Sequence, residues 1–343
     1  MKKLSLILTQ YKETEAECFM CLNSLNSQMN CEFDNFEIII INDCSDNILS
    51  EHFLKQFPNL DIQYVSMTKN IGKGSCLQFG IDHACGEYIM IVDIDDHLYS
   101  NYVFSYFESC IHPSKANLYI TSFLESYKPI FSDEIHYMYH YSGASSYTHG
   151  KFYNRQFLID NNIRFLSGIK WHDDVYINLI IHLILGETHE SIVHSKEFVS
   201  YVWAYNDKSV TRFDDSFYHL YSSATFIYVV DQALSFSNDF LFDKLQFDAI
   251  KILSFYYYSV NTDVWHEERA IPWKEQTENM VSYFINKWTH LFEDMTMNKG
   301  FIEGHVDGIS QIMIIPEESF PHWFNRIKAL NITELPEFKQ TPD

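Results

Sequence analysis

The chain has 343 residues, 46% of them apolar, and is long enough to bury a large core and to form more than one domain. With 24 basic and 46 acidic residues its formal charge is -22, which repels phosphate backbones, so no nucleic acid partner is expected. The first residues do not form a signal peptide, and no run of about 18 uninterrupted apolar residues marks a transmembrane segment. We therefore expect a cytoplasmic protein, either free or peripheral at the inner face of the membrane.

Short β-rich segments alternate with helical patterns in the first third of the chain. The segment 36–41 is almost continuously apolar, as expected for a strand buried on both faces. This alternation predicts a mostly parallel sheet with helices on both faces. The first helix is expected to bury one face, made of Cys18, Cys21, Leu22, Leu25 and Met29. The other expected elements are strands at 4–8, 62–67, 88–92 and 118–121, and helices at 49–57 and 74–84.

The pattern changes in the second half of the chain. Segment 135–141 alternates like an exposed hairpin strand, rich in Tyr and His. From about residue 214 onward, long helical patterns dominate and prolines punctuate them. We therefore expect an α/β domain at 1–213 and a mostly helical C-terminal domain at 214–343. The helices expected in the second domain are 217–234, 239–258 and 275–295.

Polar residues follow three of the expected strands, where parallel sheets bind their ligands. Thr9, Gln10 and Tyr11 follow the first strand, the segment 42–46 ends the second, and 93–96 follows the fourth. Carboxylates two positions apart at a strand end reach the same side and can bind a divalent cation through oxygen. Asp93 and Asp95 have this spacing, although clustered acids can also simply cap a strand and solvate a turn.

The order of these motifs resembles the family-two glycosyltransferases. The segment 70–74, Asn-Ile-Gly-Lys-Gly, leads through Gly86-Glu87-Tyr88 to Asp93-Ile94-Asp95, which is similar to the family's glycine loop, GxY strand and DxD motif. The segment 42–46 looks like its DDGSxD turn, with Cys44 in place of the usual glycine. The resemblance covers about 210 residues and implies the GT-A fold, Rossmann-like with a mostly parallel sheet, for the catalytic domain.

Specific donor-site roles follow from the resemblance. Asp43 is implied to recognise the nucleobase, Asp93 to contact the ribose, and Asp95 to hold the metal with Asp93 beside it. Lys73 is expected near the donor phosphates, although a lysine in a solvent-facing loop is the alternative. The further residues expected to bind the nucleotide sugar are Thr9, Gln10, Tyr11, Asn70 and Ile94.

A second stretch, 151–176, resembles the family segment that ends in Glu-Asp. There the Asp is the general base, so the resemblance gives Asp174 that role and puts Asp173 in place of the Glu. An ordinary carboxylate has a pKa near 4 but is ionised at neutral pH and can still accept a proton late in the reaction. The alternative is that both acids cap the helix expected at 175–185.

The segment 201–212 is similar to the family's lid. The alternative is that the same residues form an ordinary strand and loop. In a lid, the hydroxyls and guanidinium of this segment are expected to close over the diphosphate. The lid residues are Ser209, Thr211 and Arg212. Three histidines are possible extra metal ligands, and the sequence does not choose among His149, His172 and His194.

The resemblance thus implies a transferase of the hexosyl or N-acetylhexosaminyl class that inverts the anomeric centre in a single displacement. The expected donor is a UDP-sugar, the cofactor Mn²⁺ or Mg²⁺, and the acceptor a carbohydrate, glycan or glycosylated polymer. The C-terminal domain would bind the acceptor or form a homo-oligomer. Two alternatives stay open: a sugar-phosphate nucleotidyltransferase, and a noncatalytic carbohydrate-binding protein on the same fold.

Overall fold

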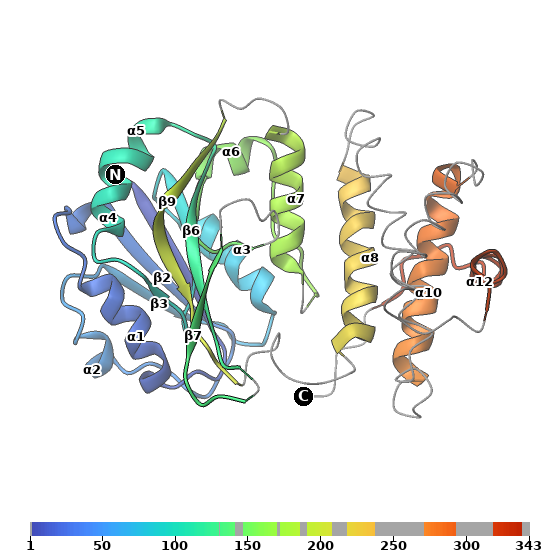
Figure 1. Cartoon of the computed structure of the whole chain (residues 1–343), viewed down its shortest axis with the longest axis horizontal. Helices are drawn as coiled ribbons and strands as arrows, with labels where there is room; N and C mark the ends of the chain where they lie inside the picture. The colour runs from blue at the N-terminus through green and yellow to red at the C-terminus, as the bar shows by residue number, and fades with distance from the viewer. Residues whose placement is uncertain are drawn as a thin grey trace. The chain divides into compact units, whose positions relative to one another are not determined.

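The computed structural model divides into two compact units, Met1–Phe213 and Asp214–Asp343 (Figure 1). The structure describes residues 2–129, 131–140, 147–169, 172–185, 191–207, 218–236, 271–292 and 318–337.

The first unit is built on a nine-stranded sheet with the order β3-β2-β1-β4-β8-β6-β9-β5, and β7 pairs with β6 beside this path. The first four strands are parallel to one another, β8 runs antiparallel between β4 and β6, and β9 is parallel to β6. This confirms the expected mostly parallel sheet. The strands are β1 Leu4–Gln10, β2 Phe36–Asn42, β3 Ile62–Ser66, β4 Tyr88–Asp93, β5 His97–Leu98, β6 Leu118–Tyr127, β7 His136–His140, β8 Lys151–Asn154 and β9 Ile192–Trp203.

Helices cover both faces of this sheet, with α1 and α4 on one side and α3, α6 and α7 on the other (Figure 1). A capping box starts α1, in which the Thr14 side chain accepts from the Glu17 amide while Glu17 accepts from the Thr14 amide. The helices are α1 Glu15–Asn26, α2 Glu51–Leu54, α3 Lys73–His83, α4 Val103–Tyr106, α5 His112–Ser114, α6 Arg155–Asp160 and α7 Asp173–Leu185, with a π-helical turn at Phe107–Ile111.

The sequence patterns located most of these elements, with two local differences. Cys18, Cys21, Leu22 and Leu25 form the buried face of α1, but Met29 lies beyond the end of the helix and is 48% exposed. Its assignment to that face was wrong, because the helix ends three residues earlier, at Asn26. β6 is much longer than the expected strand at 118–121, since its outer half pairs with the exposed strand β7.

The described part of the second unit is helical, as expected. It contains α8 (Tyr218–Phe236), α10 (Ile271–Lys287), a 3-10 turn at Thr289–Phe292 and α12 (Phe320–Lys328). Asp231 is fully buried between helices and is bound by the Lys287 ammonium and the Trp288 indole N–H, both at 2.8 Å. The helix expected at 239–258 lies outside the described residues. Among the residues that are described, none of the helices is long and apolar enough to span a bilayer.

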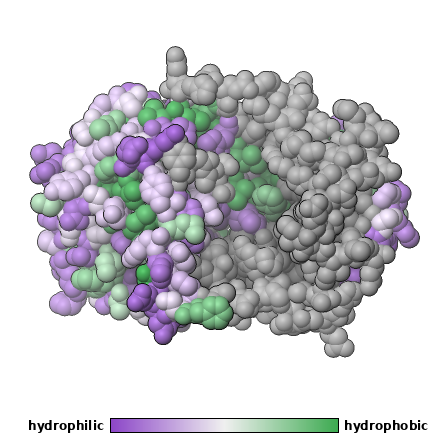
Figure 2. All heavy atoms as spheres, in the orientation of Figure 1, coloured by the Kyte–Doolittle hydropathy of each residue, from purple (hydrophilic) through white to green (hydrophobic). Residues whose placement is uncertain are grey.

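The surface of the first unit mixes polar and apolar side chains. On the side seen in Figure 2 its residues are mostly hydrophilic, with hydrophobic ones in between. The strand β7 also exposes aromatic side chains, since Tyr137 and Tyr139 are 60% and 51% exposed.

Candidate active site

The candidate site lies at the carboxyl end of β4, where the buried strand ends in Asp93. The Lys73 ammonium lies 2.7 Å from Asp93 Oδ1. Lys73 is the first residue of α3, directly after Gly72, whose φ of +83° and ψ of 152° are conformations that residues with a Cβ avoid. The glycine loop therefore positions this lysine against the DxD carboxylate.

Asp43 holds the same loop from the end of β2. Its two carboxylate oxygens accept hydrogen bonds from the backbone N–H groups of Ile71 (2.7 Å) and Gly72 (2.9 Å). The neighbouring Cys44 adopts φ +59°, so the left-handed turn typical of a glycine is kept with a cysteine in it. Asp43 is buried and joins two of the expected donor-site motifs.

The DxD carboxylates sit in different electrostatic environments. Burial opposes ionisation of Asp93, but the positive charge of Lys73 and the contact with His149 outweigh it and lower the pKa of Asp93. Burial opposes the charge of Lys73, but the carboxylates of Asp93, Asp173 and Asp174 together outweigh it and raise the pKa of Lys73. Burial and the charge of Asp93 together raise the pKa of Asp95, which accepts a hydrogen bond from the Asn206 amide at 2.9 Å.

Asp96 is a buried residue of this turn to which the sequence assigned no role. Its oxygens accept hydrogen bonds from the Tyr201 hydroxyl (2.6 Å) and the Ala204 amide (2.7 Å). The Tyr201 oxygen also accepts from the Asp93 amide at 3.1 Å. These bonds tie the DxD turn to β9. The only sequence signal was that Asp96 directly follows the DxD.

A group of three side chains could hold a metal ion. Ligand atoms of Asp93, Asp96 and His149 all lie within 4.8 Å of one another, and His149 Nε2 is 3.9 Å from Asp93 Oδ2. Burial lowers the pKa of His149, which favours the neutral imidazole that can bind a metal. Of the three histidines considered from sequence, His149 is the one in this group. His194 lies at the other end of β9, opposite Ile120.

Asp173 and Asp174 occupy the first turn of α7, which begins two residues earlier than expected. α3 approaches this turn closely at Gly74, where an added Cβ would lie 2.5 Å from the Leu166 carbonyl oxygen and 3.5 Å from Asp173 Cβ. Lys73 therefore interacts electrostatically with both aspartates as well as with Asp93. The fold brings together two acidic motifs that are about 80 residues apart in the sequence.

The pKa of Asp174 is raised to about 7, first by burial and then by the charge of Asp173. Burial also raises the pKa of Asp173, whose buried Oδ2 has no hydrogen-bond partner among the described residues. Asp174 Oδ1 accepts from the Val175 amide at 2.8 Å, so it is part of the helix start as well. A carboxylate with a pKa near neutrality is a better base than an ordinary aspartate.

The residues after β1 are only partly free for a ligand. The Gln10 amide donates to the carbonyls of Glu13 (2.8 Å) and Asn47 (2.6 Å) and accepts from the Tyr64 hydroxyl (2.8 Å), so its side chain holds the loop. Tyr11 is 39% exposed. Glu13, which the sequence did not single out, has its pKa raised to about 7 by burial.

The remaining expected donor residues have different positions. Thr9 is partly buried and Asn70 is exposed. Ile94 is 1% exposed with its side chain in the core, so it can meet a ligand only through its backbone. Ser209, Thr211 and Arg212 lie outside the described residues.

The comparison with known families identifies the first unit. Residues 5–170 match the family described as glycosyl transferase family 2.

Curated relatives each match less than a third of the chain. The poly-beta-1,6-N-acetyl-D-glucosamine synthase of Staphylococcus epidermidis is 35% identical over 92 residues, which are 27% of this chain and 21% of that protein. The putative glycosyltransferase EpsH of Bacillus subtilis is 35% identical over 100 residues, 29% of this chain and 28% of that protein. The chain thus spans less than a third of the length of these relatives.

Solved structures extend the likeness over most of the chain. Residues 1–349 of S. aureus TarS, crystallised with UDP-GlcNAc, superpose with a TM-score of 0.60 and 16% identity, covering 83% of this chain and 81% of that one. The complex of the same TarS fragment with UDP gives a TM-score of 0.58. At this identity the likeness shows the fold, which is the GT-A fold with an additional domain.

Proposed function

We propose that the chain is an inverting glycosyltransferase that moves a sugar from a UDP-sugar donor to an acceptor hydroxyl. The observation that carries this proposal is the meeting of two acidic motifs around one lysine. Lys73 pairs with Asp93 at 2.7 Å and interacts with Asp173 and Asp174 at the start of α7. A cation and a DxD suit a diphosphate leaving group, and a carboxylate across from them suits an attacking hydroxyl.

The donor proposed is a UDP-linked N-acetylhexosamine. A curated relative is named as a synthase of an N-acetylglucosamine polymer, and the TarS fragment was crystallised with UDP-GlcNAc. Asp43 is the residue proposed to contact the uracil, with Thr9, Tyr11 and Asn70 near the nucleotide. Ser209, Thr211 and Arg212 are proposed to close over the diphosphate.

The proposed cofactor is Mn²⁺ or Mg²⁺, and two ligand sets share Asp93. One is the DxD pair, Asp93 with Asp95, and the other is Asp93 with Asp96 and His149. Carboxylate oxygens and a neutral imidazole suit Mn²⁺, and the close approach of these atoms fits a single ion. When bound, the ion would neutralise charge that develops on the departing diphosphate.

Asp174 is the proposed general base. The acceptor oxygen bonds to the anomeric carbon as the bond from that carbon to the diphosphate oxygen breaks, the hydroxyl proton passes to Asp174, and nucleoside diphosphate leaves. Attack from the face opposite the leaving group inverts the anomeric centre. Lys73 stays charged throughout and contributes attraction for the diphosphate.

The alternatives fit the molecule less well. A sugar-phosphate nucleotidyltransferase needs a glycine-rich loop after the first strand, whereas Gln10 there holds an ordinary loop through three hydrogen bonds. A noncatalytic carbohydrate-binding protein does not require the two acidic motifs that meet around Lys73. The second unit is proposed to bind the acceptor or to form a homo-oligomer, and the site of action is proposed to be the cytoplasm.

A screen of nucleotide sugars by thermal shift, with and without Mn²⁺, tests the proposal. A ligand at 100 times its dissociation constant adds about 2.7 kcal/mol to the stability of the folded state. A UDP-sugar that stabilises the chain only with Mn²⁺ should also release UDP on incubation. Stabilisation without any release of UDP would favour the noncatalytic alternative, and no stabilisation by any nucleotide sugar would contradict the donor assignment.

A further inference from the structure

Rings from β6, β7, β9 and the segment before β8 gather beside Asp93, and we name them the ring cluster: Phe123, His140, Tyr147, His149 and Trp203. His140 stacks on Phe123 with ring centroids 4.7 Å apart, and Phe123 meets His149 edge-on at 5.3 Å. Tyr147 lies 5.7 Å from both His149 and Trp203. The cluster is therefore continuous from the outer strand β7 to the metal-binding candidates.

A hydrogen-bonded pair of Glu125 and His140 lies at the edge of the ring cluster. His140 Nε2 is 2.7 Å from Glu125 Oε2, and these side chains are 25% and 22% exposed. Glu125 is the register partner of Trp203 between β6 and β9, so both side chains share one face of the sheet. A carboxylate and an imidazole thus reach water next to aromatic rings. The donor chemistry proposed above uses neither of them.

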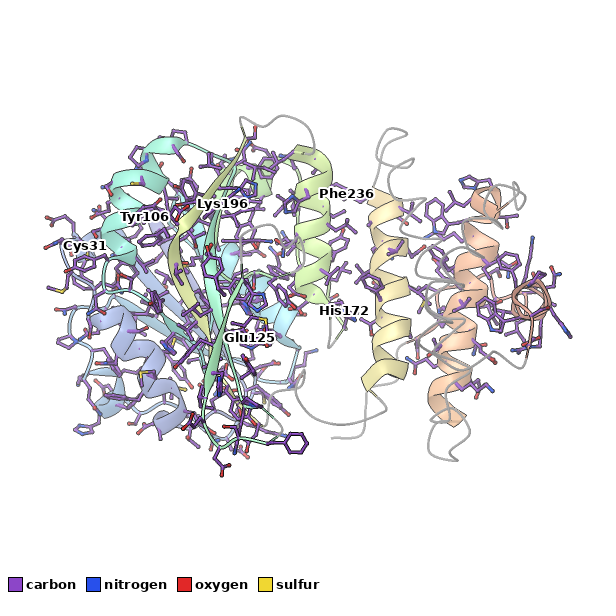
Figure 3. The ribbon with its side chains drawn as sticks, viewed as in Figure 1. Cys31, Tyr106, Glu125, His172, Lys196 and Phe236 are labelled. Carbon is purple, nitrogen blue, oxygen red and sulfur yellow. The ribbon has the colours of Figure 1, made fainter. Side chains whose placement is uncertain are left out.

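The ring cluster adjoins both halves of the proposed reaction centre. His149 is 3.9 Å from Asp93. On the other side, the Asn178 amide donates to the carbonyl of Tyr147 at 3.1 Å and to that of Asp174 at 2.8 Å. Figure 3 shows Glu125 on the sheet and His172 at the start of α7, both toward the end of the unit where β6 ends. An acceptor whose hydroxyl meets Asp174 must lay the rest of its ring on a neighbouring surface.

We propose that Glu125, His140 and Trp203 bind a sugar ring of a neutral carbohydrate acceptor. A sugar presents C–H groups that pack on aromatic rings and hydroxyls that form hydrogen bonds with carboxylates and imidazoles, and Trp203, Glu125 and His140 offer these groups together. Neutrality follows from charge, since Glu125 and the surplus of 22 negative charges repel an anionic polymer. This inference rests on the proposed function, because it takes Asp174 as the base.

An array of neutral and anionic oligosaccharides tests the proposal with the full chain. The wild-type protein should retain at least one neutral oligosaccharide, and Glu125→Gln should bind it at least about tenfold more weakly, the loss expected for a hydrogen bond to a charged group. Glu87→Gln is the matched control, because Glu87 forms a similar pair with His112 at 3.2 Å just before β4, at the opposite end of that strand. This control should bind like the wild type.

Three results would overturn the proposal: no oligosaccharide retained by the wild type, retention of anionic ones alone, or unchanged binding by Glu125→Gln. If Glu125→Gln does not fold by thermal melting, His140→Gln takes its place with the same expectation. Calorimetry of UDP with Mn²⁺ separates this test from that of the proposed function. Glu125→Gln should bind UDP like the wild type. If the wild type does not bind UDP, the donor assignment is contradicted. The oligosaccharide array still tests the proposed acceptor site in that case.

Discussion

Two carboxylates of the same site, Asp93 and Asp174, are shifted in opposite directions. Lys73 and His149 lower the pKa of Asp93 against its burial, whereas burial and Asp173 raise the pKa of Asp174 to about 7. The Lys73 ammonium contacts Asp93 directly and interacts electrostatically with both Asp93 and Asp174. The balance between burial and neighbouring charges therefore separates the two roles: an ionised carboxylate suits a metal ion, and one that exchanges a proton near neutrality suits a base.

The largest effect is expected for Asp174→Asn, which keeps the size of the side chain and removes its basicity. Turnover should fall by about 10²- to 10⁴-fold, the usual contribution of a general base, while donor affinity persists. Steady-state rates together with calorimetry of UDP check this. Asp173→Asn is the control and should lose much less. Small and equal effects at both positions would show that the pair only starts α7, because Asn caps a helix almost as well as Asp.

Asp95→Ala tests the proposed metal-binding role of the DxD carboxylates. Removing this oxygen ligand should abolish the Mn²⁺-dependent part of UDP binding, measured by calorimetry with and without the ion. His149→Ala, assayed in parallel, distinguishes the two ligand sets. If UDP affinity and its Mn²⁺ dependence survive in Asp95→Ala but not in His149→Ala, the ion belongs to the set of Asp93, Asp96 and His149.

The pH dependence sharpens the assignment of the base. Asp174 must be deprotonated to act, so kcat should rise with pH and level off above its pKa of about 7. Asp173→Asn removes a negative charge that raises this pKa, so the rising limb should move to lower pH by roughly half to one unit. A profile that does not move would mean that another group titrates.

Asp43→Ala should have a smaller effect. Uridine nucleotides should bind more weakly, by a few fold to about tenfold for one lost polar contact, while the response to Mn²⁺ stays intact. Calorimetry of UDP across Mn²⁺ concentrations measures both quantities. Equal loss of the metal response would instead show that the loop at Ile71 and Gly72, which Asp43 holds, has collapsed.

The smallest expected effect is on stability. Asp174 has a pKa near 4 in the unfolded chain and about 7 in the folded one, so the folded state holds the proton more tightly and loses stability as pH rises between these values. Asn does not ionise, so Asp174→Asn does not lose this stability and should melt at least about 2–4 °C above the wild type at pH 8. A lower melting temperature would mean that the ionised form is well stabilised.

Local sequence patterns determined the parallel half of the sheet and the place of the donor motifs in it. Continuous apolar runs such as 36–41 form strands buried on both faces, and polar residues at their ends necessarily reach one edge. The place of the DxD and of the segment with Asp43 follows from this rule, whereas the loop at Lys73 and the role of each residue came from the resemblance to the family. The cysteine in place of the usual glycine left the backbone of this turn undecided, and the structure shows that Cys44 keeps the left-handed conformation, with φ +59°.

The tertiary structure decided what these residues can do. A pKa depends on burial and on charges that lie close in space, and Asp174 meets Lys73 only because α3 packs against the start of α7 at Gly74. The bonds from Tyr201 to Asp96 and the approach of His149 to Asp93 join segments 50 to 110 residues apart. Periodicity carries no information on such distant contacts, because it records which face of an element is buried and not what lies against it.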